Sequence, residues 1–290
     1  MAAVAVGWGS IGLIVREVPE PATVIVFARV SVAAAGLGLW IRFVRTKKPG
    51  EPGFFEFRPR RAASQGVILA AHWVALFAAF QRAPVGTVVL ITYVAPVIVA
   101  LVAPRLLDER ASPAVLVGLA VAVVGSVLVL GPGASGAALS GVVLSAVAAI
   151  LLAVLIVNAK ILSRHLDGVR LAFLQVTVAA AVLVPVVAVD ADGWPDGASI
   201  AWLLLLGLVH TAAGLVVYFW ALAQMPATSV GVLAYLEPAA GVAFAWWLLS
   251  EQPSPATIVG GLLIMTAGLL VVRAGDDAGP PATASVARYH

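Results

Sequence analysis

The chain has 290 residues, of which 62% are hydrophobic and 11% are charged, and its formal net charge is +3. A soluble domain carries about 25% charged residues, so lipid has to cover much of this chain's surface. The basic residues stand in loops beside apolar runs, which indicates membrane topology and not a nucleic-acid-binding face. Because there is no cysteine, disulfides, thiolate metal sites and thiol nucleophiles are excluded.

Ten apolar runs, separated by charges, prolines and glycines, predict ten membrane-spanning helices. In chain order they cover 2–16, 22–44, 62–82, 84–105, 113–130, 138–162, 169–189, 198–223, 226–249 and 255–273. The first run is short and has no basic residues before it, so we expect a spanning helix and not a cleavable signal peptide. The break at Arg82–Pro84 is the shortest. The predicted fold is an all-α polytopic membrane protein.

Lysine and arginine predict the orientation. The 42–61 loop carries seven of these residues, and fourteen of the 17 fall on one side of the predicted membrane. The opposite loop at 190–196 has three aspartates and no base. Because basic loops stay in the cytoplasm, we expect a multi-pass protein of the cell (inner) membrane with both termini cytoplasmic. Residues 274–290 are expected to form a disordered cytoplasmic tail.

The two halves of the chain are related by a shift of 142 residues. Residues 80–96 then lie over 222–238, and 106–118 over 248–260. The shift aligns Tyr93 with Tyr235, Pro96 with Pro238, and Glu109 with Glu251. Each half, 1–131 and 137–273, holds five spans, and an odd number forces the two repeats to cross the membrane in opposite senses. Such inverted five-helix repeats are typical of secondary transporters.

Several residues resemble one known family. Trp8, Gly9 and Ser10 in the first span, Arg29 in the second, and the doubled segments around Glu109 and Glu251 resemble EamA-type ten-helix members of the drug/metabolite transporter superfamily. The resemblance covers about 2–273. It implies gradient-driven export of small organic metabolites such as amino acids by alternating access, with no cofactor. The expected partners are a small-molecule substrate, lipid and protons, with no nucleic acid, and the protein is expected to be a monomer or homodimer.

Glu237 is the main candidate for coupling or substrate binding. It faces Ala95 under the repeat, so the duplicated fold does not demand a carboxylate there. Two interpretations stay open. A protonated Glu237 could donate a hydrogen bond to the Ala234 carbonyl that Pro238 leaves unpaired. Alternatively, it carries a proton or binds a substrate amine.

The remaining candidates share mid-membrane depth. His72 and His210 are unrepeated and either relay protons or bond a backbone carbonyl. Aromatic residues either line an amphipathic cavity or pack the core: Tyr93, Tyr235, Tyr218 and Trp8. Arg29 either extends toward the membrane surface or meets a substrate carboxylate. Pro96 and Pro238 are kinks or moving hinges. We identify no catalytic residue and no metal ligand.

Other classes of protein explain the sequence less well. The "GASG" at 133–136, with Ser135 and His210, imitates a serine intramembrane protease, but it falls in a glycine-rich loop. The chain has no HExxH, Walker or GxSxG motif, so we predict a protein that is not an enzyme. A passive channel would need a continuous polar pore, for which few polar residues are present. A membrane-embedded assembly partner without transport is the third alternative.

Overall fold

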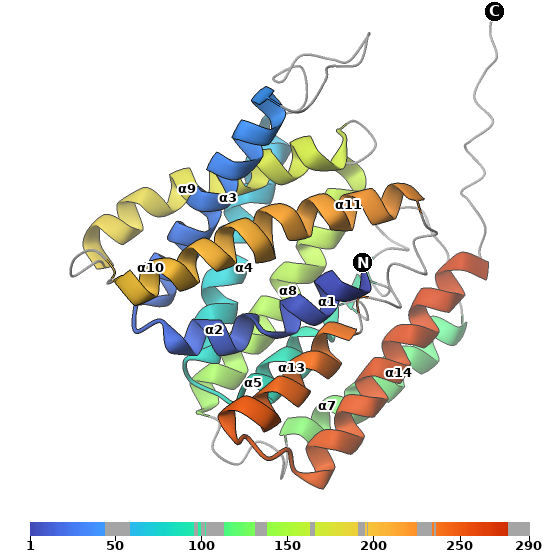
Figure 1. Cartoon of the computed structure of the whole chain (residues 1–290). Coiled ribbons are helices and arrows are strands. Elements are labelled where there is room, and N and C mark those ends of the chain that lie inside the picture. Colours follow the sequence, from blue (N-terminus) through green and yellow to red (C-terminus); the bar gives the residue numbers. More distant parts are fainter. Residues whose placement is uncertain are drawn as a thin grey trace, which may run out of the picture.

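The structure, a computed structural model, describes residues 1–43, 59–95, 98–99, 102, 113–130, 138–162, 166–190, 195, 197–224, 234 and 236–277. The helices of the first half are α1 (Ala2–Gly9), α2 (Ile11–Glu17), α3 (Ala22–Phe43), α4 (Pro59–Phe80), α5 (Val85–Thr92) and α7 (Pro113–Leu130). Those of the second half are α8 (Leu139–Leu162), α9 (Gly168–Asp190), α10 (Gly197–Leu204), η2 (Leu205–Ala213), α11 (Gly214–Gln224), α13 (Leu236–Leu249) and α14 (Pro255–Asp277). Each of the ten predicted spans contains at least one of these helices (Figure 1).

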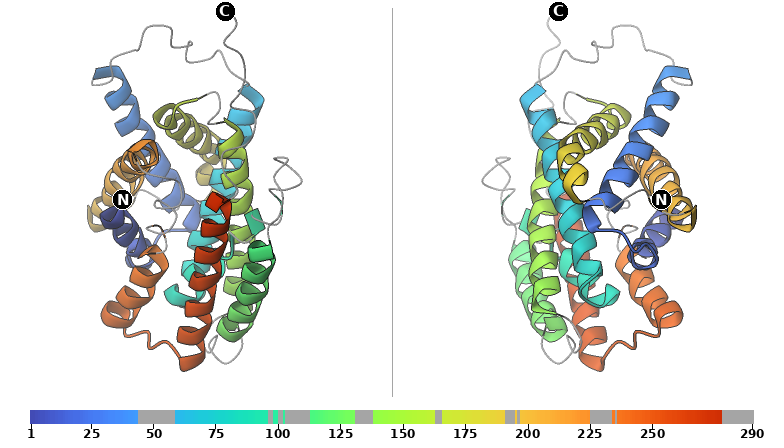
Figure 2. Two further views of the ribbon diagram at one scale, coloured as in Figure 1. Left: turned by 90° about the vertical axis from the view of Figure 1, so that its right-hand side faces the viewer. Right: turned by 90° about the vertical axis from the view of Figure 1, so that its left-hand side faces the viewer.

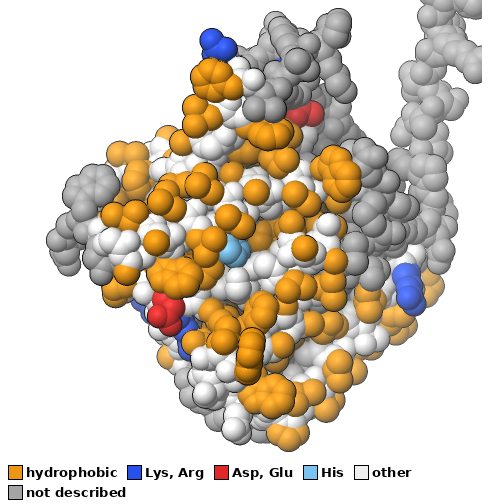
Figure 3. All heavy atoms as spheres, in the orientation of Figure 1, with side chains coloured by type: hydrophobic (Ala, Val, Ile, Leu, Met, Phe, Trp, Pro, Cys, Tyr) orange, Lys and Arg blue, Asp and Glu red, His pale blue; other side chains and the backbone are white. Residues whose placement is uncertain are grey.

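The all-α prediction is confirmed, and so is the break between the third and fourth spans, because α4 ends at Phe80 and α5 begins at Val85. Helix α14 continues to Asp277, four residues into the segment expected to be a tail; 278–290 lie outside the described residues. Five of the described helices are long and apolar enough to cross a membrane: 22–43, 63–80, 139–159, 168–190 and 197–218. Hydrophobic side chains cover most of the face in Figure 3, as a lipid-facing surface requires.

Two spans that the sequence predicts as single runs have irregular backbones. The first bends at Ser10, between α1 and α2, where the Ser10 N–H and hydroxyl both donate to the carbonyl of Gly7 at 3.0 Å and 2.7 Å. The eighth contains a nine-residue π-helix, η2. Wide turns of this kind are rare and often mark functional sites. The sequence reasoning missed both features.

Contacts between chain reversals show that the two halves are inverted. Arg16, at the end of α2, pairs with Glu251, which follows α13, and donates to the carbonyl of Ala83 before α5. Ala138, just before α8, donates its N–H to the carbonyl of Arg82 at 3.2 Å. All these reversals therefore lie at one end of the bundle, which we call the Glu251 end. Helix α1 runs toward this end and α8 away from it, while α5 runs away and α13 toward it.

Helix packing follows the same pseudo-symmetry. Helix α3 packs on its repeat mate α9, and α7 on its mate α14 (Figures 1 and 2). The contact of α4 with α9 is matched by that of α3 with η2, and the contact of α5 with α8 by that of α13 with α1. One pair breaks the pattern: α4 lies along α8, whereas α1 touches η2 and α11 only slightly. The two repeats therefore share a scaffold but not every interface.

Glycines permit the closest helix contacts. A Cβ at Gly125 of α7 would lie 2.6 Å from the carbonyl oxygen of Gly260 in α14. The face of α7 that carries Gly125 therefore packs inside the bundle against α14. A Cβ at Gly9 would lie 2.7–2.9 Å from atoms of Ala240, Gly241 and Glu237 in α13, whereas a Cβ at Gly7 would meet nothing within 4 Å. Only Gly9 therefore lets the backbones of α1 and α13 touch.

This difference predicts opposite effects for two alanines in one helix. Gly9→Ala should lower the free energy of unfolding by about 1–3 kcal/mol, because an added methyl group forces α1 and α13 apart. Gly7→Ala adds the same methyl group in open space and should be neutral, or stabilising by up to about 1 kcal/mol. Thermal unfolding of the two purified variants in detergent measures the difference. Equal midpoints would contradict the packing described for Gly9.

Candidate functional site

Glu237 lies in the first turn of α13, where the helix dipole favours a negative charge. Its Oε2 accepts a hydrogen bond from the hydroxyl of Tyr93, at 2.6 Å. Tyr93 caps the C-terminus of α5. This bond therefore joins the fourth span of the chain, in the first repeat, to the ninth span, in the second repeat. Pro238 is buried in the same first turn, where a proline's missing N–H leaves no helical bond unmade. Its hinge role stays a prediction.

The carbonyl of Ala234 lies near a second donor besides Glu237. The Tyr93 hydroxyl lies 3.2 Å from this oxygen and 2.6 Å from Glu237 Oε2. A phenol has one proton to donate, so both interpretations of Glu237 stay open: an ionised Glu237 accepts that proton, and a protonated Glu237 leaves it for Ala234. The Glu237 carboxyl keeps its other oxygen for a further partner, as a proton carrier or amine ligand requires.

Trp8, His210 and Tyr218 meet where α1 faces η2 and α11. The indole Nε1 of Trp8 donates to the His210 carbonyl at 2.7 Å, and the Trp8 and Tyr218 rings are 6.0 Å apart. The Ser10 hydroxyl lies 3.0 Å from His210 Nε2. The bend at Ser10 therefore places a hydroxyl against the imidazole. Ser10 was quoted only as part of the family resemblance, and its role in the site was missed.

The π-helix directs two neighbouring side chains to different partners. His210 Nδ1 lies 3.2 Å from the carbonyl of Leu205, and the Thr211 hydroxyl donates to the carbonyl of Leu206 at 2.7 Å. Both bonds reach back five residues, the spacing of a π-turn. His210 then faces Ser10, while Thr211 Oγ1 accepts a hydrogen bond from Arg29.

Arg29 is inside the bundle and does not extend to the membrane surface, because only 3% of it is exposed. Its Nε donates to Thr211 Oγ1 at 2.5 Å. The guanidinium carbon lies 4.0 Å from the ring centre of Trp73 and 5.3 Å from that of Phe77. Arg29 is also close enough to Glu237 for their charges to interact, although no direct ion pair joins it to a described carboxylate.

His72 has no hydrogen bond to this cluster, but it is close enough to Arg29 for their charges to interact. Its Nδ1 lies 2.8 Å from the carbonyl of Ala148 in α8, and its side chain is buried. Its bond to a carbonyl matches one of the two interpretations that the sequence left open. Tyr235, Pro96, Glu109 and Ser135 lie outside the described residues. Among the residues that the structure does describe, no group of three or more histidines and carboxylates could hold a metal ion.

A second buried polar group was missed by the sequence reasoning. Gln65 Nε2 donates at 3.3 Å to both the Leu155 carbonyl and Gln175 Oε1, and Gln65 Oε1 accepts from Asn158 at 2.8 Å. A signal for it exists in the sequence. With a local shift of 146 residues, four more than the shift of 142 used above, "RVSVAAA" at 29–35 resembles "QVTVAAA" at 175–181. In this register Gln175 of α9 takes the position that Arg29 holds in α3.

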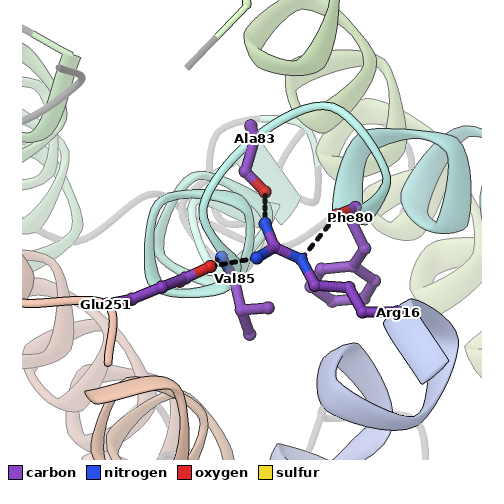
Figure 4. A network of polar contacts seen from close by, with 5 residues as sticks. All are labelled: Arg16, Phe80, Ala83, Val85 and Glu251. Atoms are coloured by element: carbon purple, nitrogen blue, oxygen red, sulfur yellow. Dashed lines mark hydrogen bonds and ion pairs between the residues drawn. The ribbon is translucent and has the colours of Figure 1, made fainter. Parts of the chain in front are cut away.

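A network of polar contacts holds three segments of the chain together at the Glu251 end (Figure 4). Arg16 donates from Nε to the Phe80 carbonyl at 3.0 Å, from Nη2 to the Ala83 carbonyl at 2.6 Å, and from Nη1 to Glu251. Glu251 Oε2 in turn accepts the Val85 N–H at 2.9 Å. We call this set of residues the Arg16 clamp. A cleft of about 650 Å³ lies beside it, lined by 18–21 and Phe80–Gln81 among others.

Comparison with known proteins agrees with this architecture. The model of the EamA-like transporter family matches residues 1–131 and again residues 139–273. No curated protein matches the chain. One solved protein, described only as a crystal structure of a protein, is 18% identical with a TM-score of 0.69, over 96% of this chain and 97% of that one; this likeness shows the fold alone. The resemblance seen in the sequence is confirmed, and the chain, a multi-pass membrane protein, belongs to the EamA-like transporter family of the drug/metabolite transporter superfamily, a family of transporters and not of enzymes.

Proposed function

We propose that this protein is a gradient-driven carrier that exports small organic metabolites, such as amino acids, by alternating access. The observation that carries the proposal is the bond between Tyr93 and Glu237. It joins the two inverted repeats through a residue pair that the repeat itself does not require. The repeat counterpart of Glu237 is Ala95, so the shared fold does not need a carboxylate there. A carboxylate in a membrane span is expensive and marks ion or substrate pathways.

The Arg16 clamp supports alternating access. It ties α2, the turn between α4 and α5, and the turn between α13 and α14 into one closed end. Carriers of inverted repeats close one end while the other admits substrate. The repeat counterpart of Arg16 is Asn158, which cannot form an ion pair. The two ends are therefore held by different chemistry.

The finer parts of the proposal rest on chemistry and charge placement. Protons are the coupling ion that fits Glu237 and His210, since both side chains exchange protons and both touch hydroxyl groups. The basic loops place both termini in the cytoplasm, and the Glu251 end then faces away from the cytoplasm. Residues 1–131 and 137–273 are the two moving repeats.

The coupling role of Glu237 predicts a selective loss in Glu237→Gln. Glutamine keeps the size and the acceptor for Tyr93 but carries no exchangeable acid, so flux driven by a pH gradient should fall to the level of protein-free vesicles. The assay uses proteoliposomes and the compound identified by a resistance screen of cells that overproduce the chain. Glu17→Gln removes an exposed carboxylate and is the control. Unchanged pH-driven flux in Glu237→Gln would assign Glu237 to structure only.

The clamp predicts that Arg16→Gln opens the Glu251 end. Because the chain has no cysteine, a single cysteine can report the opening, and Val89→Cys serves because Val89 is buried between α5 and α13. Arg16→Gln removes a partly exposed ion pair and two hydrogen bonds to backbone carbonyls. A loss of about 1–3 kcal/mol should speed labelling by an impermeant maleimide at least about 5-fold.

Arg82→Gln is the matched control for this experiment. Arg82 is an exposed arginine at the same end, and its side chain donates to the Ala78 carbonyl of its own helix. Its loss should leave the labelling rate of the cysteine unchanged. Equal rates in Arg16→Gln and Arg82→Gln would show that the clamp does not hold the end closed.

A further inference from the structure

We propose that Arg29 binds the carboxylate of the transported molecule. This inference rests on the proposed function, because it assigns a substrate class to the same site. The basis for this inference is a buried charge inside the bundle that has few hydrogen-bond partners. Arg29 is almost completely buried, yet only one of its three nitrogens has a hydrogen-bond partner among the described residues.

The surroundings of Arg29 fix where its free donors are. Thr211 holds Nε, and the π-turn holds Thr211 through the Leu206 carbonyl. Trp73 covers one face of the guanidinium at 4.0 Å. The edge formed by Nη1 and Nη2 remains, with four N–H groups in a rigid plane. No hydrogen bond from this edge to a described residue is present.

The Nη atoms of Arg29 are not among the fully enclosed side-chain atoms without a partner, so water-sized space reaches this edge inside the bundle. A buried charge needs both a counter-charge and hydrogen bonds, and without them it destabilises the fold. The charges of Glu237 and Arg29 interact without direct contact, because no ion pair links the two residues. Oε2 of Glu237 is bonded to Tyr93. The protein therefore holds a buried cation whose best partner is not supplied by the described part of the chain.

The shape of the free edge selects the ligand. Two parallel N–H groups of arginine match the two oxygens of a carboxylate, in a bidentate pair that lysine cannot make. The aromatic face of Trp73 keeps the fork oriented. Glu237, in the ninth span and the other repeat, is close enough to Arg29 for their charges to interact and offers the opposite charge for an amine. A small molecule with a carboxylate at one end and an amine at the other satisfies both residues.

The test measures binding by the purified full-length protein in detergent, independently of transport. The probes are the twenty common amino acids, acetate, lactate and succinate, each compared with its carboxamide, and inorganic phosphate. Each probe is scored by its shift of the thermal unfolding midpoint. At least one carboxylate should raise the midpoint of the wild type, while its amide should not. Arg29→Gln should weaken that carboxylate about 10-fold or more.

Two further variants serve as a control and as a test of whether charge alone is enough for binding. Arg42→Gln removes an exposed arginine from the same helix and should bind the carboxylate as the wild type does. Arg29→Lys keeps the charge without the fork, and its affinity should be intermediate. If Arg29→Gln does not fold, the comparison of acid with amide in the wild type and Arg29→Lys still decides.

Three results would overturn the assignment: equal stabilisation by acid and amide, stabilisation by phosphate but by no carboxylate, or no stabilisation by any probe. The proposed function fails separately. Saturable, gradient-driven flux that does not distinguish acid from amide would reject only the role of Arg29. Carboxylate binding that depends on Arg29, without flux under any gradient, would reject the carrier and keep the site.

Discussion

Buried polar groups in a membrane have to be satisfied by the protein itself, because hydrocarbon offers them no hydrogen-bond partner. In this chain the constraint is strongest at Arg29, and the neighbouring helices are shaped around it. Gly207 of η2 has no side chain, and a Cβ there would lie 2.5 Å from Val32 of α3. That close approach brings Thr211 within reach of Nε. The π-helix is therefore part of the solution to burying a charge, and His210 is turned toward Ser10 by the same distortion.

Duplication supplies the scaffold, and departures from it supply the polar site. Where both repeats keep an apolar or glycine position, the helices pack as pseudo-symmetric pairs, such as α7 with α14. Where the repeats differ, one copy carries a charge and the other does not. Under the shift of 142, Glu237 stands opposite Ala95 and Arg16 opposite Asn158; under the local shift of 146, Arg29 stands opposite Gln175. A perfectly repeated set of charges would make the two ends of the bundle equivalent, and in this chain the two ends differ.

The sequence was sufficient for the spans, the repeat and the all-α fold, because apolar run length and aligned prolines carry that information directly. It also selected Tyr93 and Glu237, which the structure joins. It could not select the partners of Arg29. These spans are apolar on nearly every side, so the pattern of hydrophobic residues does not reveal which face of a helix points inward. Thr211 is a partner of Arg29 because the π-turn directs its side chain toward α3, and the sequence pattern does not reveal that turn.

In the proposed alternating-access cycle, the Arg16 clamp has to be weak enough to break. Arg16 and Glu251 keep 29% and 19% of their side chains exposed, and ion pairs so close to water contribute about 0–1 kcal/mol. The accompanying bonds to the Phe80, Ala83 and Val85 backbones are individually worth about 1 kcal/mol. A ligand can shift a two-state equilibrium only by its difference in affinity for the two states. If Arg29 binds a carboxylate as proposed, a clamp of a few kcal/mol is of the same order as that one bidentate contact, whereas a buried ion pair at that end would oppose the proposed opening more strongly.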